Sequence, residues 1–182
     1  MSNKMIPLTI AALMTFTAVQ PAMSQQRPEV PADRAALVLH RQHLSGPRFG
    51  FTTFTGDLAK QRAEADMSNI MSQFGWQFET QVMSTNSGVT ALMEWIFLVG
   101  GVEQDELNVG VSWMAGFRTE DGLEFGVGPN IGVNKDGNST TSMVVAAGST
   151  LPFGDIYVPI NIAAAFAEGG PRITTLIGWI IG

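Results

Sequence analysis

The chain has 182 residues, of which 45% are hydrophobic and only 14% are charged, and its formal net charge is −6. This length fits one domain with its own core, and the charged fraction is low for a soluble protein, where about a quarter of the residues are charged. The ten Lys and Arg residues are scattered, so we expect no nucleic-acid partner. Cysteine is absent, which excludes disulfides and thiolate chemistry.

The N-terminal part predicts an export signal followed by a linker. Lys4 precedes an apolar run at 5–19, and the small residues AMS then form a cleavage site, so we expect a signal peptide over 1–24. Residues 25–44 are polar and contain prolines at first, and should form a linker and a short helix. The folded domain is then expected over 45–182.

From residue 46 onward the chain alternates between apolar and polar residues, which is the pattern of half-buried strands. Eight extended segments are predicted, over 46–55, 72–83, 88–99, 106–118, 122–134, 140–150, 155–166 and 171–181. Most connections are short and rich in Gly, Asn, Asp and Ser, which favours antiparallel neighbours. The exception, 57–71, is rich in helix formers and predicts a helix or a long loop. The predicted fold is all-β: an eight-stranded antiparallel up-and-down β-barrel with a short N-terminal helix.

The two faces of these strands differ in chemistry. The apolar face carries about a dozen aromatic residues and no charge, whereas the other face carries glycines and polar residues. All the in-strand charges therefore share the polar face, and they are Arg48, Glu79, Glu94, Arg118, Glu124 and Arg172. Three positive and three negative groups on one face predict a salt-bridged charge network in the barrel interior, with a pore lining or small-ligand site as the other interpretation.

Which face points inward decides the class of protein, and two alternatives are open. With the apolar face inward, the chain is a soluble periplasmic or secreted β-barrel that binds a lipid or another apolar small ligand in its interior. With the apolar face outward, it is a transmembrane barrel whose partner is membrane lipid. An eight-stranded barrel has little room for a dozen rings, and strands of this length suit a tilted bilayer crossing of about 9–11 residues, so we favour the second.

The phrases SGPRFGFT, SQFGWQFE and LEFGVGPN, the hairpin pattern over about 45–182 and the signal peptide together resemble the small eight-stranded outer-membrane β-barrel proteins of Gram-negative bacteria. This resemblance implies a porin-like cell-envelope protein in the outer membrane, inserted by the outer-membrane assembly machinery. It also implies a structural or surface-interaction role. Two departures favour the soluble alternative. Barrels of this class usually finish on an aromatic residue, whereas the last aromatic residue here, Trp179, comes three positions before the end of the given sequence. In addition, Pro129 and Pro159 lie inside strands, where each needs a bulge or a position beyond the membrane.

Candidates for catalysis and metal binding are few. His40 and His43 are the only histidines, and no third metal ligand is evident near them. Asn134, Asp136 and Asn138 alternate in a loop but lack the glycine position and the closing Glu of a calcium loop. We therefore expect no enzyme activity, no catalytic or metal site and no cofactor.

Overall fold

A computed structural model describes residues 44–85 and 87–181. The predicted signal peptide at 1–24 lies outside these residues, as does the predicted linker and short helix at 25–44 apart from Leu44. These two domain assignments therefore remain predictions.

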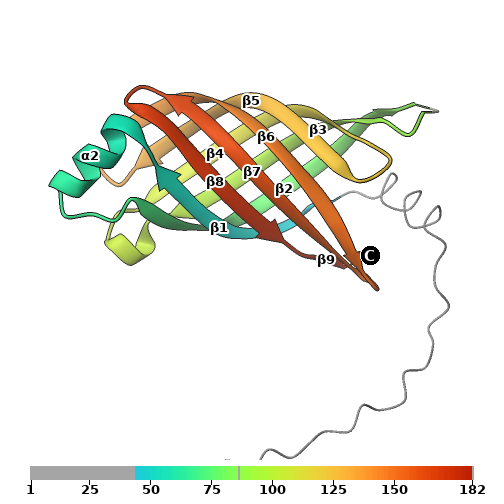
Figure 1. Cartoon of the computed structure of the whole chain (residues 1–182), viewed down its shortest axis with the longest axis horizontal. Coiled ribbons are helices and arrows are strands. Elements are labelled where there is room, and N and C mark those ends of the chain that lie inside the picture. The colour runs from blue at the N-terminus through green and yellow to red at the C-terminus, as the bar shows by residue number, and fades with distance from the viewer. Residues whose placement is uncertain (1–43, 86, 182) are drawn as a thin grey trace, which may run out of the picture. The chain divides into compact units, whose positions relative to one another are not determined.

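The described chain forms a closed, eight-stranded antiparallel barrel, which confirms the predicted fold (Figure 1). Each strand from β1 to β7 pairs with the next in sequence, pairing of β8 with β1 closes the ring, and the short β9 pairs with β7. The strands are β1 (Gly46–Phe54), β2 (Ile70–Ser84), β3 (Thr90–Gly100), β4 (Asn108–Arg118), β5 (Leu123–Asn134), β6 (Ser139–Phe153), β7 (Ile156–Ala167), β8 (Gly170–Gly178) and β9 (Ile180–Ile181). The last two are parts of one predicted strand.

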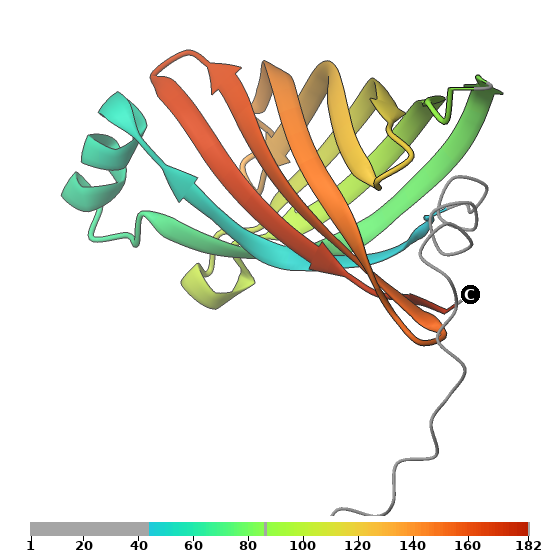
Figure 2. The same cartoon turned by 45° about the vertical axis from the view of Figure 1, so that its right-hand side comes forward.

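The two ends of the barrel differ in their connections. Helix α2 (Gly56–Glu64), the short 3-10 helix η1 (Val102–Gln104) and the β5–β6 and β7–β8 turns lie at one end, which we call the helix end (Figures 1 and 2). The β2–β3, β4–β5 and β6–β7 turns and β9 lie at the other end, which we call the turn end. Helix α2 falls in the segment 57–71 that was predicted to be a helix or a long loop.

Pro129 is accommodated without the bulge expected for it. The β4–β5 pairing stops at Ser112 and Asn130 and resumes in the same register at Ala115 and Val127. On its other side Pro129 still pairs with β6. Since proline has no N–H to donate, the ladder skips two pairs locally, and the register is kept.

Pro159 has a similar effect on the last strand. Pairing between β7 and β8 begins at Ile160 and Ile177, whereas Tyr157 pairs with Ile180 of β9 in the same register. The gap opposite Pro159 therefore divides the predicted strand 171–181 into β8 and β9. The bulge expected at this proline is absent too. Among the described ladders, the register shifts between Gln81 and Met83 of β2.

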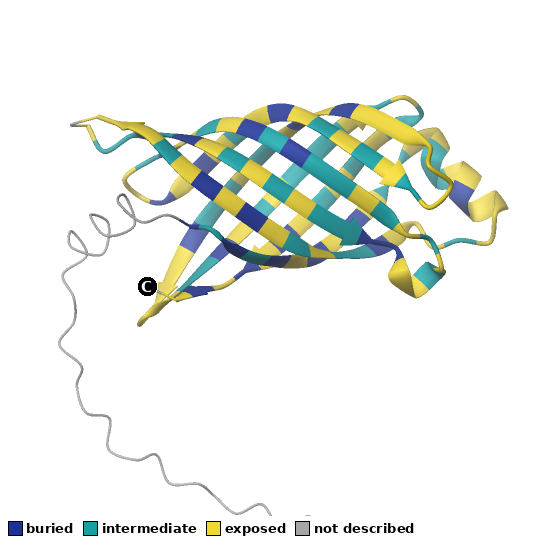
Figure 3. Cartoon of the chain, turned by 180° about the vertical axis from the view of Figure 1, so that it is seen from behind, coloured by how far each residue is buried: buried dark blue, intermediate teal, exposed yellow. Residues whose placement is uncertain are grey.

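The apolar face points outward and the polar face points inward. Along each strand buried and exposed residues alternate, as the pleat requires (Figure 3). Phe51 is 53% exposed and Trp76 45%, whereas Arg118 is 0% exposed. The alternative with an apolar interior, and with it an interior site for a lipid, is therefore wrong: the aromatic residues surround the barrel, and the charges fill part of its inside.

Candidate functional site

A cluster of buried side chains around Arg118 lies in the turn-end half of the interior. Its Nε donates to Glu124 Oε1 over 2.8 Å, while Nη1 donates to Glu79 Oε1 over 3.0 Å and Nη2 contacts the other oxygen of Glu79. Thr150 Oγ1 also donates to Glu124, over 3.2 Å. All four side chains are buried. One guanidinium thus holds two carboxylates from β2 and β5, with the fork geometry that makes such pairs strong.

A second cluster, around Arg48, lies in the same half of the barrel. Arg48 Nε donates to Gln77 Oε1 over 3.0 Å, and its Nη atoms donate to the carbonyl oxygens of Leu44 and Pro47 over 2.9 and 3.0 Å. Gln77 in turn donates through Nε2 to Glu94. Gln77 therefore links a cation on β1 to a carboxylate on β3 without a direct ion pair.

Arg172, the sixth charge predicted for the network, lies apart from the other five. It is at the start of β8, near the helix end, and its Nη2 donates to Ser142 Oγ over 3.2 Å. Its buried Nε faces no acceptor among the described side chains, and none of the described carboxylates forms an ion pair with it within 4.0 Å. The structure thus brings Arg48, Glu79, Glu94, Arg118 and Glu124 into one half and leaves Arg172 in the other.

A cavity of about 450 Å³ occupies the helix-end half of the interior. It reaches from Leu58 and Arg62 of α2 down to Gln77 and Glu94, which form its floor. The room comes from small inward residues on β6 and β7, which are Val144, Ala146, Ala163 and Ala165. Sequence reasoning missed this cavity; the signal was a stretch of β6 and β7 with small side chains on its inner face.

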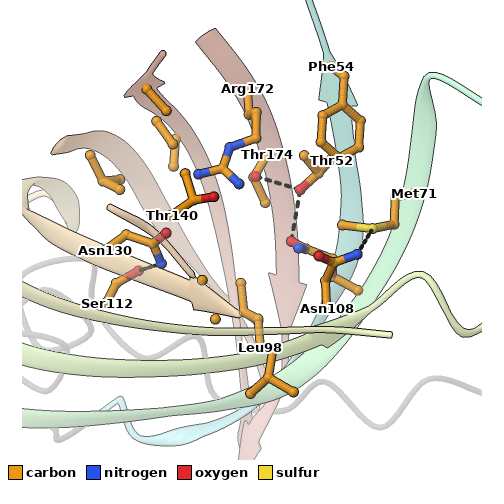
Figure 4. Close-up of a pocket in the computed structure, with 18 of the residues that line it drawn as sticks. Thr52, Phe54, Met71, Leu98, Asn108, Ser112, Asn130, Thr140, Arg172 and Thr174 are labelled. Carbon is orange, nitrogen blue, oxygen red and sulfur yellow. Dashed lines mark hydrogen bonds between the residues drawn. The ribbon is translucent and has the colours of Figure 1, made fainter. Parts of the chain in front are cut away.

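Hydrogen-bonded polar side chains line the cavity wall. Ser142 Oγ accepts from Arg172 and donates to Asn130 Oδ1 over 3.3 Å, and Asn130 Nδ2 donates to Ser112 Oγ over 3.0 Å. On the opposite wall the Thr52 hydroxyl shares hydrogen bonds with Thr174, and with Gln73, over 2.6 and 2.8 Å (Figure 4). These neutral groups are satisfied by one another, so the wall is polar and ordered.

Arg62 fastens the rim of this cavity. Its Nε donates to the Ser68 carbonyl over 2.8 Å, and Nη1 and Nη2 donate to Glu106 and Gln104 over 2.7 Å each. The guanidinium also lies 4.2 Å from the centre of the Phe54 ring. Because α2 and the β3–β4 connection are far apart in sequence, this one buried side chain joins two connections at the mouth of the cavity.

Glu103 of η1 makes a second rim contact. Its carboxylate accepts from the backbone N–H and the hydroxyl of Ser72 over 2.7 and 2.6 Å. These hydrogen bonds to the charged form lower the pKa of Glu103 to about 2, although the side chain is exposed. The contact therefore anchors η1 to the start of β2 at neutral pH.

The described residues hold no group of three or more His, Cys, Asp or Glu side chains that could bind a metal ion. Within the same residues, no helix has the length and apolar character needed to cross a membrane. His40 and His43 lie outside the described part of the chain. The loop at 134–138 is a turn in which Asn134 Oδ1 accepts from the N–H groups of Asp136 and Asn138.

No protein-family model and no curated protein matches the chain. Solved structures of Ail, the attachment invasion locus protein of Yersinia pestis, are similar to it. The crystal structure in complex with the heparin analogue sucrose octasulfate is 13% identical, with 76% of this chain and 97% of that chain covered and a TM-score of 0.47. Another crystal structure of Ail is 15% identical, with 74% of this chain and 95% of that chain covered and a TM-score of 0.46.

A third similar structure is the backbone structure of the outer membrane protein Ail in a phospholipid bilayer nanodisc. It is 14% identical, covers 76% of this chain and 97% of that chain, and has a TM-score of 0.43. At these values the likeness concerns the arrangement of the chain and assigns no ligand, partner or role.

Proposed function

We propose that this chain is an exported outer-membrane β-barrel protein of a Gram-negative cell envelope, with a structural or surface-interaction role and no enzymatic step of its own. The observation that carries the proposal is the inverted distribution of side chains. Large apolar residues stay exposed around a closed barrel, while its arginines and glutamates are buried inside.

The exposed apolar surface is continuous around the barrel. It includes Phe49, Phe51, Phe74, Trp76, Phe78, Trp95, Phe97, Phe117, Phe125, Val127, Ile131, Val145, Ile162, Phe166 and Ile177, all of them 42–56% exposed. Such an area exceeds by far the few hundred Å² of apolar patch that a soluble monomer exposes. In a membrane this apolar surface contacts lipid and is not exposed to water. A closed barrel also pairs the backbone groups of its strands with one another, as a membrane requires.

The two ends indicate the orientation. The connections at the helix end include residues 55–69 and 101–107, whereas 119–122 and 154–155 join strands at the turn end. Transmembrane barrels of bacteria have short periplasmic turns and longer extracellular loops. We therefore place the helix end, with its cavity, at the cell surface and the turn end in the periplasm. Membrane lipid and the assembly machinery are the partners of this proposal.

The buried charges are better explained by a barrel interior that is blocked than by a channel that conducts ions. The clusters around Arg118 and Arg48 close the turn-end half, and eight strands leave space only for side chains there. We propose that five of the six inner charges serve the barrel's own stability, and that Arg172 has a separate task. The cavity then ends at its floor and does not cross the membrane.

Cell fractionation tests this function. The full chain, expressed with its signal peptide, should remain with outer membranes after a carbonate wash and should migrate faster on a gel before heating than after it. In planar bilayers the purified protein should give no stable single-channel conductance. Release as a soluble periplasmic protein would refute the membrane assignment, and steady conductance would refute the plug.

A further inference from the structure

We propose that the cavity in the helix-end half is a binding site for a small organic anion, and that Arg172 is the group that holds the anion's charge. This proposal goes beyond the envelope role above and does not depend on it, because it is argued from the cavity and Arg172. Arg172, Thr174 and Thr140 lie together on its wall (Figure 4).

Arg172 differs from the other arginines of the interior in the hydrogen-bond partners of its guanidinium group. Arg118 binds two carboxylates, Arg62 binds a carboxylate, an amide and a carbonyl, and Arg48 binds an amide and two carbonyls. Arg172 donates one hydrogen bond, to the neutral hydroxyl of Ser142. A guanidinium has five N–H donors arranged in a fork that matches a carboxylate or phosphate. Nε of Arg172 is buried and one N–H of Nη2 binds Ser142, so the remaining Nη donors are the ones that a ligand in the cavity can reach.

The carboxylates that line the cavity do not neutralise this cation. Glu106 is paired with Arg62 at the rim, Glu94 accepts the amide of Gln77 at the floor, and Glu168 is exposed in the β7–β8 turn. Of the two arginines on the cavity wall, Arg62 has a described carboxylate within 4.0 Å and Arg172 has none. A half-buried charge without a counter-ion costs free energy, which a bound anion would recover.

The wall beside Arg172 determines what else the ligand contains. Val144, Ala163, Ala165 and Leu176 form an apolar patch, and Thr52, Thr174 and Asn130 make the surrounding wall polar while their own hydrogen bonds are satisfied within it. The volume of about 450 Å³ lies within the range of about 300–1,000 Å³ found for small-molecule sites. The matching ligand is a small anion with a compact apolar body, such as an aromatic or short aliphatic carboxylate.

Three probes of nearly equal shape separate charge from shape: benzoate, benzamide and benzylammonium. Binding is measured by titration calorimetry on the folded protein in nanodiscs of zwitterionic phosphatidylcholine, with ¹⁵N NMR of arginine Nε–H groups as a second readout. Benzoate should bind more tightly than benzamide and should shift one Nε–H resonance, which is missing in Arg172→Gln. Loss of a hydrogen-bonded charge predicts binding of benzoate weaker by about tenfold or more in Arg172→Gln.

Lys60→Gln is the matched control, because it removes a positive charge from α2, where Lys60 is exposed and paired with Asp57. Benzoate binding should be unchanged in Lys60→Gln, and both variants should retain the gel shift of the folded barrel. Equal binding of benzoate and benzamide, preference for benzylammonium, absence of benzoate binding at millimolar concentration, or an equal loss in Lys60→Gln would each overturn the proposal.

Discussion

The two halves of this barrel are built from the same eight strands but have opposite interiors. In the turn-end half, Arg118 and Arg48 fill the interior with long side chains that bind carboxylates, amides and carbonyls. In the helix-end half, short residues face inward from β6 and β7, and a cavity remains. The comparison shows that alternation of polar and apolar residues specifies the barrel, whereas the size of the inward residues decides whether a given level is plugged or open.

The largest expected change in stability comes from a pair of variants that removes one arginine charge from each half. Arg118→Met leaves Glu79 and Glu124 buried without their cation and should lower the free energy of unfolding by about 3–5 kcal/mol. Arg172→Met removes a cation that has no described carboxylate partner within 4.0 Å, so its loss should be much smaller. Urea titration of the gel shift in detergent measures both. Equal losses would show that the two halves do not differ in this way.

A charge placed on the outer face sharpens the contrast between outside and inside. Val127 is 49% exposed near the middle of β5, and Val127→Lys should destabilise the barrel in bilayers by about 2–4 kcal/mol. Ala146→Lys, on the cavity wall not far from Glu94, should cost less because its charge meets polar groups. Urea titration of both variants in lipid vesicles measures this difference. A smaller loss for the outer lysine would contradict a lipid-facing surface.

Two inward glycines of the same strand separate tight packing from open space. A methyl group at Gly128 would lie 1.9 Å from the Trp113 carbonyl oxygen, whereas one at Gly132 has its nearest heavy atoms at 4.0 Å. Gly128→Ala should therefore lower stability by about 1–3 kcal/mol, and Gly132→Ala should be nearly neutral. Thermal gel-shift curves compare them, and equal midpoints would mean that the backbone at Gly128 relaxes freely.

The smallest expected effect is the loss of the contact between Glu103 and Ser72 at the rim when the pH is lowered. Because the pKa of Glu103 is about 2 when its Ser72 contact forms, the contact stabilises η1 above the usual glutamate pKa and is lost as the pH falls from about 4.5 to about 2. The protection factor of the Ser72 N–H, which is the intrinsic exchange rate at each pH divided by the observed rate, should fall over this range. In Glu103→Gln the same N–H should show little of this pH dependence, and an unchanged profile in the variant would refute the assignment.

The strands and their faces could be predicted because strand side chains alternate strictly, so one misplaced residue would put a charge into the apolar face. The spatial grouping of the charges could not be predicted from the sequence. Arg118 meets Glu79, which is 39 residues away, only because the β2–β3 and β3–β4 registers bring them to one level. Arg172 has the same parity but starts its strand at the opposite end. The cavity was missed for a related reason, since it depends on the combined volume of side chains from several strands.

The most direct test of the central claim uses the tryptophans, which all belong to the outward parity. Trp76, Trp95 and Trp179 are 45–54% exposed, and Trp113 is partly exposed. In vesicles of lipids brominated along the acyl chains, tryptophan fluorescence should be strongly quenched relative to unbrominated lipids, and Arg172→Met should be quenched to the same degree. Fluorescence that is the same in both lipids would place the aromatic face away from the bilayer and contradict this account.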